Sequence, residues 1–277
     1  MVNNYLTEQE LRGNSPETIK YYRATLQYFL EYAGAQAVTL ELCRAYQLEL
    51  MHRALSSVSV QTYIRALRAF LTWSYHEGYL PEDISVRLRL PKAQRKVIDI
   101  LTDTEVQTLL QAAAATPQAV RDTAIVSLML DAGLRLSEVA SARADHLHLL
   151  ERYLIVTGKG NKQRIVPFGR TAALALEDLS LSCGALFTLD NGQPVTQDTI
   201  KQLFKRLRKA TGIQKLHPHL LRHTFATRYL ENGGNIYTLQ AIMGHTSLEM
   251  VKRYLHLANS RIRRDFDRYS PLDLLGK

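Results

Sequence analysis

The stretch HPHLLRHTFATRYLE, residues 217–231, carries polar and cationic side chains at helical spacing inside a segment otherwise patterned like a protein core. Pro218 suits the first position of a helix, and the Asn-Gly-Gly that follows the stretch would end it. On that helix His219, Arg222 and His223 share one stripe, while the apolar residues can face the core. Burying these groups together is costly unless an anion lies opposite them. The stretch therefore predicts either an anion site or a solvated basic face with one capping histidine.

Length and cysteine content indicate a two-domain protein of the cytoplasm. A chain of 277 residues is long enough for two domains, and an apolar share of 46% is ample for two packed cores. Cys43 and Cys183 lie far apart without paired spacing, which suits a reducing compartment and indicates neither a disulfide framework nor a zinc site. The N-terminus lacks a signal-peptide pattern, and no run of about 20 apolar residues occurs. We therefore expect a cytoplasmic protein that has no membrane partner.

The net charge of +9 is unevenly distributed along the chain. Residues 1–90 contain 9 Lys or Arg and 9 Asp or Glu, so the whole excess of positive charge belongs to the rest of the sequence. A basic domain of this size most often binds a polyanion, and nucleic acid is the leading candidate. The alternative is that the charge serves only solubility.

Residues 1–90 have the pattern of an all-helical bundle. Apolar residues at helical spacing predict helices at about 16–34, 39–51 and 57–76, with a short fourth helix around 81–88. The first of these has a capping Asn-Ser, a proline and an acidic first turn as its start signal. A small helical domain of about 90 residues follows from this pattern.

One side of the third predicted helix carries Gln61, Arg65 and Arg68. These side chains are candidate phosphate contacts, although a solvated face is an equal alternative. The stretch that follows the bundle, 91–100, includes Pro-Lys-Ala-Gln-Arg-Lys without apolar periodicity and is expected to be a linker. Its cations, among them Lys96, would cross a nucleic-acid backbone readily.

Residues 101–277 alternate helical patterns with short strands, so we expect a mixed α/β domain in a mainly helical protein with one small sheet. A capping box begins a helix at about 102–115, and a strongly apolar helix follows at 121–130. Strands at 153–157 and 164–167 are joined by a Gly-Lys-Gly hairpin tip. Further expected elements are a hairpin near 186–192 and helices at 196–211, 217–231, 238–243, from 247 and from 261.

Several cations of this region have both a functional and an ordinary interpretation. Arg135 lies in a turn between two apolar helices and needs an anionic partner, which Glu138 could supply as a plain ion pair. Lys159 lies on the hairpin tip, where lysines commonly serve solubility alone. The helix at 196–211 is dense in cations and would fit a major groove, although peripheral charge is the commoner role for any one of them. The candidates on that helix are Lys201, Lys205 and Arg206.

Four segments in this order resemble the signature boxes of the tyrosine recombinases, the phage integrase family. The segments are GLRLSE at 133–138, TGKGNKQRIVP at 157–167, HPHLLRHTFAT at 217–227 and MGHTSLEMVKRYLH at 243–256. The resemblance covers nearly the whole chain, because residues 1–90 are similar to the family's helical, SAM-like core-binding domain. It is closest in kind to the simple, Xer-like members with two domains, so no separate arm-binding domain is expected.

The resemblance implies a role for each residue of a catalytic set. Two arginines would bind the scissile phosphate, while the first histidine assists proton removal from the tyrosine nucleophile and the second bonds the phosphate. The lysine would protonate the departing 5′ oxygen. In chain order the set is Arg135, Lys159, His219, Arg222, His245 and Tyr254. Glu138 falls where the family often has a supporting acid, His223 has at most a supporting role, and Tyr269 is the second candidate for the nucleophile.

Elementary chemistry agrees with this set. Attack on a phosphodiester accumulates negative charge, so cations already in place stabilise the transition state more than the ground state. A phenol with an ordinary pKa near ~10 is protonated at neutral pH and needs an adjacent base. The sequence has no acidic cluster with magnesium spacing and no phosphate-binding glycine loop, so neither a metal nor another cofactor is expected.

The most direct hypothesis is a site-specific DNA recombinase that cuts and rejoins strands in integration, excision or dimer resolution. Its partners would be double-stranded DNA with a specific recombination site and further copies of itself, as a dimer on each site and a tetramer in synapsis. The resemblance implies that the C-terminal tail packs on a neighbouring subunit. The alternatives are a type IB topoisomerase, which relaxes DNA as a monomer, and a non-catalytic DNA-binding regulator.

Overall fold

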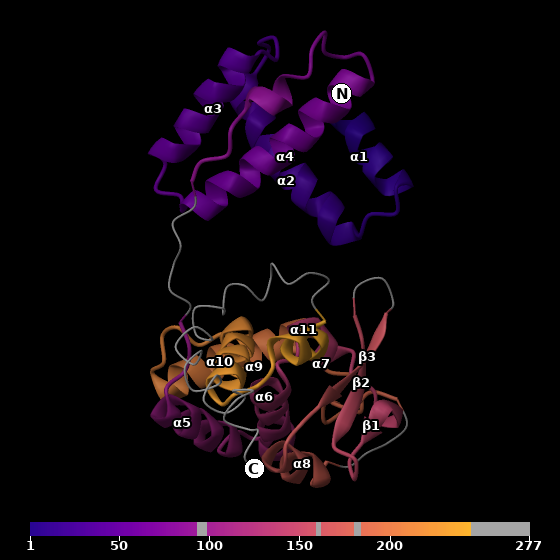
Figure 1. Ribbon diagram of the computed structural model, residues 1–277, viewed down its shortest axis with the longest axis vertical. Helices are drawn as coiled ribbons and strands as arrows, with labels where there is room; N and C mark the ends of the chain where they lie inside the picture. The colour runs from indigo at the N-terminus through magenta and orange to yellow at the C-terminus, as the bar shows by residue number, and fades with distance from the viewer. Residues whose placement is uncertain (93–98, 159–161, 180–183, 245–277) are drawn as a thin grey trace, which may run out of the picture. The chain divides into compact units, whose positions relative to one another are not determined.

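The computed structural model describes the chain except residues 93–98, 159–161, 180–183 and 245–277. The chain forms two compact units, Met1–Val97 and Ile98–Lys277. Helices dominate both units, and a small sheet occurs in the second (Figure 1). The expected fold class, mainly α with a small β-sheet, is confirmed. Within the described residues, none of the helices combines the length and apolar character needed to cross a bilayer.

The first unit is a helical bundle in which the longest helix, α4, packs against the other elements. From the N-terminus the elements are α1 (Val2–Leu11), α2 (Pro16–Ala33), α3 (Leu40–His52), α4 (Ser57–His76) and the 3₁₀ turn η1 (Ile84–Arg87). Serine or threonine side chains cap the three helices expected from the sequence, through Ser15, Thr39 and Ser56. These local signals explain why the expected bounds of these helices agree with the structure to within about one turn.

Two parts of this unit differ from the expectation. The short fourth helix expected near 81–88 is a 3₁₀ turn, Ile84–Arg87, capped by Asp83. Helix α1 was not expected, because its sequence is largely polar and has little amphipathic character. Tyr5 fixes this helix by packing its ring edge-on against Phe70, with the two ring centroids 5.6 Å apart. Tertiary packing, rather than local propensity, therefore stabilises α1.

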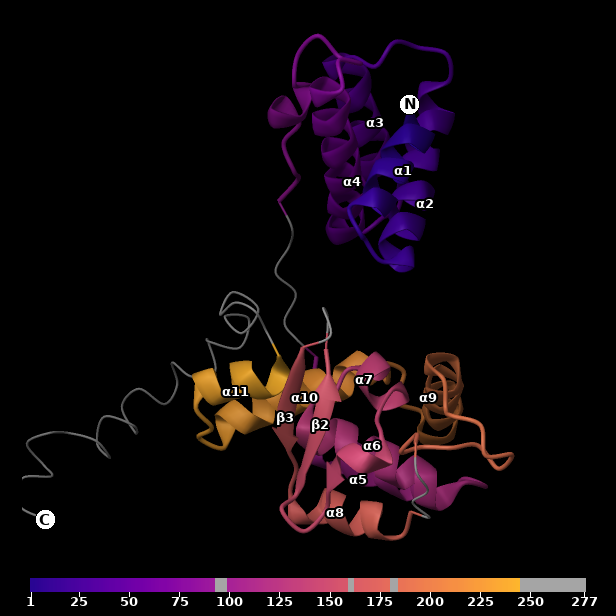
Figure 2. The ribbon, with the colours of Figure 1, turned by 90° about the vertical axis from the view of Figure 1, so that its right-hand side faces the viewer.

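The second unit holds a three-stranded antiparallel sheet against several helices. Its elements are α5 (Asp103–Ala114), α6 (Ala119–Ala132), α7 (Leu136–Ala140), η2 (Ala144–His146), β1 (Leu147–His148), β2 (Tyr153–Thr157), β3 (Gln163–Pro167), α8 (Arg170–Glu177), α9 (Gln197–Thr211), α10 (Pro218–Glu231) and α11 (Ile236–Met243). The strand order is β1-β2-β3, and Val156 of β2 lies opposite Arg164 of β3. Figure 2 shows α9 and α11 on opposite sides of this unit.

Helices α6 and α10 pack together at the centre of the unit and bring the end of one helix to the middle of the other. Helix α6 ends at Gly133 with φ +60°, and a Cβ atom there would lie 2.3 Å from the ring of Phe225 on α10. Only glycine allows this approach, because it has neither the side chain nor the steric penalty at positive φ. The contact places the carbonyl of Gly133 beside Arg222.

The second hairpin, expected near 186–192, is smaller than a pair of regular strands. Thr188 and Pro194 form an isolated bridge, and the N–H of Val195 donates to the carbonyl of Phe187 at 3.0 Å. Proline has no N–H to extend a ladder, which limits the pairing to these few contacts.

Candidate active site

Helix α10 begins with a histidine cap. Nδ1 of His217 accepts the N–H of Leu220 at 3.1 Å, and Pro218 occupies the first turn. This bond satisfies one of the free N–H groups at the helix start. His217 is thus the capping histidine, and His219 and Arg222 project from the helix that it begins.

Arg222 is buried, with 6% of its surface exposed. Its Nη1 donates to the carbonyl of Gly133 at 2.5 Å, and its Nη2 donates to the carbonyl of Met243 at 2.8 Å. The first carbonyl ends α6 and the second ends α11, so two helix C-termini, each with partial negative charge, hold one guanidinium. The alternative of a solvated basic face is therefore wrong for Arg222.

Arg135 stands at the start of α7 and is bound to Glu138 twice. Its backbone N–H donates to Oε2 at 2.8 Å, and its Nη1 donates to Oε1 at 2.7 Å. Its Nη2 donates to the carbonyl of Gly244 at 3.2 Å, and 33% of the side chain is exposed. The ion pair expected as the ordinary interpretation does form. It leaves one part of the guanidinium open to solvent.

Glu138 is buried between two arginines. Besides Arg135, it accepts two hydrogen bonds from Arg164 on β3, at 2.7 and 3.0 Å. Burial by itself would raise the pKa of this carboxyl, but the bonds from Arg164 and Arg135 outweigh it and lower the pKa to about 2. Glu138 is therefore a carboxylate at every physiological pH.

The last turn of α11 is capped by three arginines from three other elements. The accepting carbonyls belong to Ile242, Met243 and Gly244. The donors, in the same order, are Arg164, Arg222 and Arg135. Unpaired carbonyls at a helix C-terminus carry partial negative charge, so cations are stabilised there. This turn brings together guanidinium groups that are distant in sequence.

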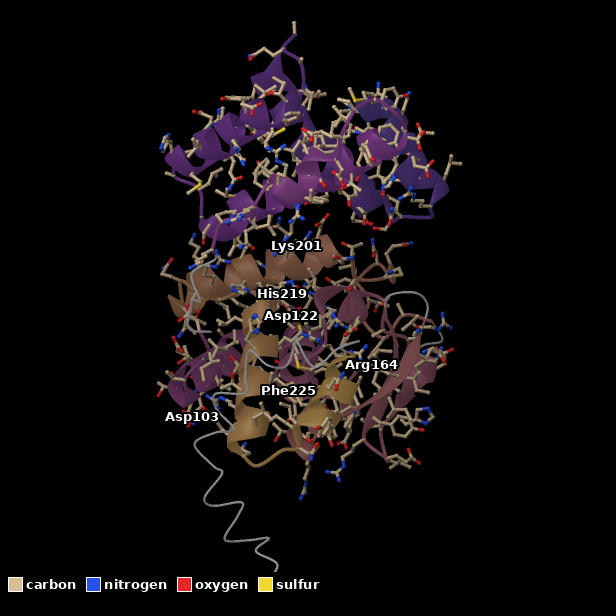
Figure 3. The ribbon with its side chains drawn as sticks, turned by 45° about the horizontal axis from the view of Figure 1, so that its top comes forward. Asp103, Asp122, Arg164, Lys201, His219 and Phe225 are labelled. Atoms are coloured by element: carbon tan, nitrogen blue, oxygen red, sulfur yellow. The ribbon has the colours of Figure 1, made fainter. Side chains whose placement is uncertain are left out.

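His219 lies close enough to Arg222 and Arg135 for their positive charges to lower its pKa. Although part of the ring faces solvent, burial of the rest lowers the pKa of His219, and the positive charges of Arg222 and Arg135 lower it further. The ring is therefore neutral at pH 7 and can accept a proton. Figure 3 shows His219 on α10 and Arg164 on β3.

The structure thus brings Arg135, His219 and Arg222 together. The other three expected catalytic residues, Lys159, His245 and Tyr254, lie outside the described residues. Glu138 was expected as a supporting acid or as the plain ion-pair partner of Arg135. Arg164 had no expected role, although a strand pattern could have indicated it, because alternation places residue 164 on the same face as the buried Val166.

The expected DNA-binding residues occupy exposed or half-buried positions on α4 and α9, and Lys96 lies outside the described residues. On α4, Arg65 is exposed and donates to Gln61 at 2.9 Å, and Arg68 is half-buried. On α9, Lys201 and Lys205 are exposed. Arg206 is also exposed, with its Nη2 lying 3.9 Å from Oδ2 of the buried Asp122.

Comparison with known proteins decides the family. The model of the phage integrase family matches residues 99–261, and the model of the phage integrase N-terminal SAM-like domain matches residues 2–78. The chain belongs to the phage integrase family of tyrosine recombinases. This recombinase is 34% identical to tyrosine recombinase XerC of Xylella fastidiosa over 94% of the chain and 92% of that protein. It is 31% identical to tyrosine recombinase XerD of Listeria monocytogenes, over 94% of each protein.

Solved structures agree on the fold of this recombinase. The Tn1549 transposon integrase in complex with transposon right end DNA has a TM-score of 0.80 at 20% identity, covering 97% of this chain and 99% of that one. A lambda integrase dimer bound to a core site has a TM-score of 0.75 at 19% identity, covering 90% and 95%. The expected resemblance to the family, and to its Xer members, is confirmed.

Proposed function

We propose that this recombinase recognises a specific site in double-stranded DNA and exchanges strands there through a 3′-phosphotyrosyl intermediate on Tyr254. The observation that carries the proposal is the meeting of Arg135 and Arg222 beside His219, whose ring is kept neutral. Two guanidinium groups can bind the non-bridging oxygens of a phosphodiester, and a neutral imidazole beside them can accept a proton. Integration, excision and dimer resolution all use this one reaction.

The proposed reaction is balanced without any further reactant. The phenol oxygen of Tyr254 attacks phosphorus and gives its proton to His219, while the bond from phosphorus to the 5′ oxygen breaks. Lys159 protonates the leaving oxygen, and His245 donates a hydrogen bond to the phosphate. The two fixed arginines stabilise the negative charge that builds up in the transition state. Because the tyrosyl ester keeps the bond energy, attack by a 5′ hydroxyl of another strand rejoins DNA by the reverse steps.

We assign the DNA contacts outside the catalytic centre to both parts of the chain. Residues 1–90 form the core-binding domain, 91–100 the linker that crosses the DNA backbone, and 101–277 the catalytic domain with a subunit-packing tail. The contacting side chains are Arg65, Arg68, Lys96, Lys201, Lys205 and Arg206. Each tyrosine holds one strand end, so exchange requires several protomers, a dimer on each site and a tetramer in synapsis. The reaction takes place in the cytoplasm, where DNA is present and the buried thiol of Cys43 stays reduced.

A nicked suicide substrate tests this function. Cleavage next to the nick releases a short fragment, so the covalent protein–DNA adduct accumulates and can be counted on a denaturing gel. We expect an adduct with the wild-type protein and with Tyr269→Phe, but none with Tyr254→Phe. Equal amounts of adduct from wild type and from Tyr254→Phe would show that the nucleophile is a residue other than Tyr254. No adduct from any of the three proteins would indicate a DNA-binding regulator, and relaxation of plasmids without a site would indicate a topoisomerase.

A further inference from the structure

Arg164 links two parts of the catalytic centre that are far apart in sequence. Its Nη1 and Nη2 donate to both carboxylate oxygens of Glu138, at 2.7 and 3.0 Å, and its Nε donates to the carbonyl of Ile242 at 2.7 Å. Only 15% of the side chain is exposed. One guanidinium thus joins the carboxylate that binds Arg135 to the last turn of α11.

The backbone of Gly244 lies directly against the guanidinium of Arg164. Its φ is +61°, and a Cβ atom at this position would lie 3.0 Å from Cζ, Nε and Nη1 of Arg164. The missing side chain permits this approach at a backbone conformation that favours glycine. The carbonyl of the same residue accepts a hydrogen bond from Arg135 at 3.2 Å. Arg164 and Arg135 therefore bind the end of α11 together, through the carbonyls of Ile242 and Gly244.

We propose that Arg164 is a positioning residue for strand cleavage. It holds Glu138 and the last turn of α11 in one arrangement, and this arrangement fixes Arg135 and Arg222 relative to each other, as binding of the scissile phosphate requires. This inference rests on the function proposed above. Arg164 acts through Glu138 and α11 and does not itself touch the DNA.

The chemistry of the contacts explains why this position requires arginine. A planar guanidinium can form two parallel bonds to a carboxylate and still offer Nε to a carbonyl. A lysine ammonium is a single point charge and cannot hold this geometry. Displacing a phosphate-binding group by about 1 Å can slow an enzyme by about 10²-fold, because the transition state is stabilised only at the correct geometry.

The first test replaces Arg164 and separates cleavage from binding. We expect Arg164→Gln to lower the maximal single-turnover rate on the suicide substrate by about 10²-fold, while the protein concentration at half-maximal rate stays within about twofold. Arg164→Lys should remain at least about tenfold slow. A wild-type maximal rate in Arg164→Gln, or full recovery in Arg164→Lys, would overturn the proposal.

Arg121 supplies a matched control for the loss of a buried ion pair. It donates to the fully buried Asp122 at 2.8 and 2.9 Å, and only 11% of its side chain is exposed. Arg121→Gln should lower the melting temperature about as much as Arg164→Gln but leave the maximal cleavage rate unchanged. If Arg121→Gln slows cleavage equally, the effect of Arg164 is a general loss of stability and the positioning role is wrong.

A second pair of variants tests the same contact without removing the arginine. Gly244→Ala adds a methyl group against the Arg164 guanidinium, whereas Gly212→Ala, at φ +71°, adds one where no atom lies within 4 Å. Both substitutions carry the backbone strain of positive φ. Gly244→Ala should slow cleavage at least about tenfold more than Gly212→Ala, and equal rates for the two variants would contradict the proposal.

A double-mutant cycle separates this inference from the proposed function. If Arg164 acts through Glu138, the variant that combines Arg164→Gln with Glu138→Gln should be no slower than the slower single variant, within about twofold. Fully additive losses would overturn the proposal. Failure of the wild-type protein to form any adduct would instead overturn the proposed function. A wild-type protein that cleaves while Arg164→Gln cleaves equally fast would remove only the role of Arg164.

Discussion

The surface of α9 and the last turn of α11 both gather cations, but in opposite surroundings. On α9, Lys201 and Lys205 are exposed to solvent. At the end of α11, three guanidinium groups donate to successive backbone carbonyls, and Arg222 is 6% exposed. An exposed lysine attracts phosphate from many directions, whereas an arginine bound to backbone carbonyls keeps one fixed orientation. From this difference we propose that α9 contributes DNA affinity and that the residues at the end of α11 organise the chemistry.

Arg222→Ala should reduce the cleavage rate more than any other change considered. A small reduction would contradict the proposed contrast between α9 and the end of α11. The substitution removes charge stabilisation of the transition state, so cleavage should fall by about 10²- to 10³-fold or more. DNA affinity should change little, because one phosphate contact is lost from a footprint of many. The measurements are adduct formation on the suicide substrate and a filter-binding or anisotropy titration. Equal loss of binding and cleavage would contradict the assigned role.

The second-largest expected effect is a fall in the cleavage rate at low pH, when His219 becomes protonated. Because burial, Arg222 and Arg135 lower its pKa below the 6.5 of a free imidazole, the rate should stay level from pH 8 down to about 6.5 and fall below it. His219→Gln should be about 10²-fold slower at pH 7 and should lack this acid limb.

Protonation of His219 should also make the free energy of unfolding depend on pH. With the pKa lowered in the folded state, the unfolded chain binds this proton first, so wild type should lose stability relative to His219→Gln as the pH falls below 6.5. Thermal melts from pH 7 to 5 check the direction. In the cleavage measurements, a wild-type rate that already falls above pH 7 would show that a group other than His219 controls the rate.

Neutralising the α9 lysines should have a smaller effect of a different kind. Lys201→Ala and Lys205→Ala should each reduce the slope of log affinity against log salt by about 0.9, because each removes about one phosphate contact. The maximal single-turnover rate should stay at the wild-type value. If either variant lowers this rate at saturating DNA, the proposed division between affinity on α9 and chemistry at α11 fails.

Chelation should give the smallest effect. If guanidinium groups alone stabilise the phosphate charge, cleavage in excess EDTA should proceed at the rate seen without it, at constant ionic strength. A strict requirement for a divalent cation, restored by added Mg²⁺, would refute the metal-independent account.

Local signals explain how much of the fold could be predicted. Ser15 and Ser56 cap helices at the expected positions, and Thr102 forms the expected capping box with Glu105. Such contacts join residues a few positions apart, so the sequence alone contains them. Helix α1 lacks signals of this kind, and its existence depends on aromatic rings more than 60 residues away, such as Phe70.

In the candidate active site, too, some features could be predicted from the sequence and others depend on tertiary packing. The ordered motifs predicted Arg135, His219 and Arg222 as members of one catalytic set, because motif spacing is a property of the sequence, and the structure brings these three side chains together. The partners of these residues could not be predicted, because hydrogen bonds from Arg222 to Gly133 and Met243 depend on how α6, α10 and α11 pack. Arg164 was missed for the same reason, since its partners Glu138 and Ile242 lie 26 and 78 residues away.

By itself, the sequence determined the helical character, the caps and the residue types available for phosphoryl chemistry, because each depends on neighbours within a few positions or on composition. Only the tertiary structure decided that Arg222 is buried, that Glu138 is shared by Arg135 and Arg164, and that three guanidinium groups meet the end of one helix. Buried charges must find partners wherever packing provides them, and packing joins segments whose separation along the chain carries no local signal.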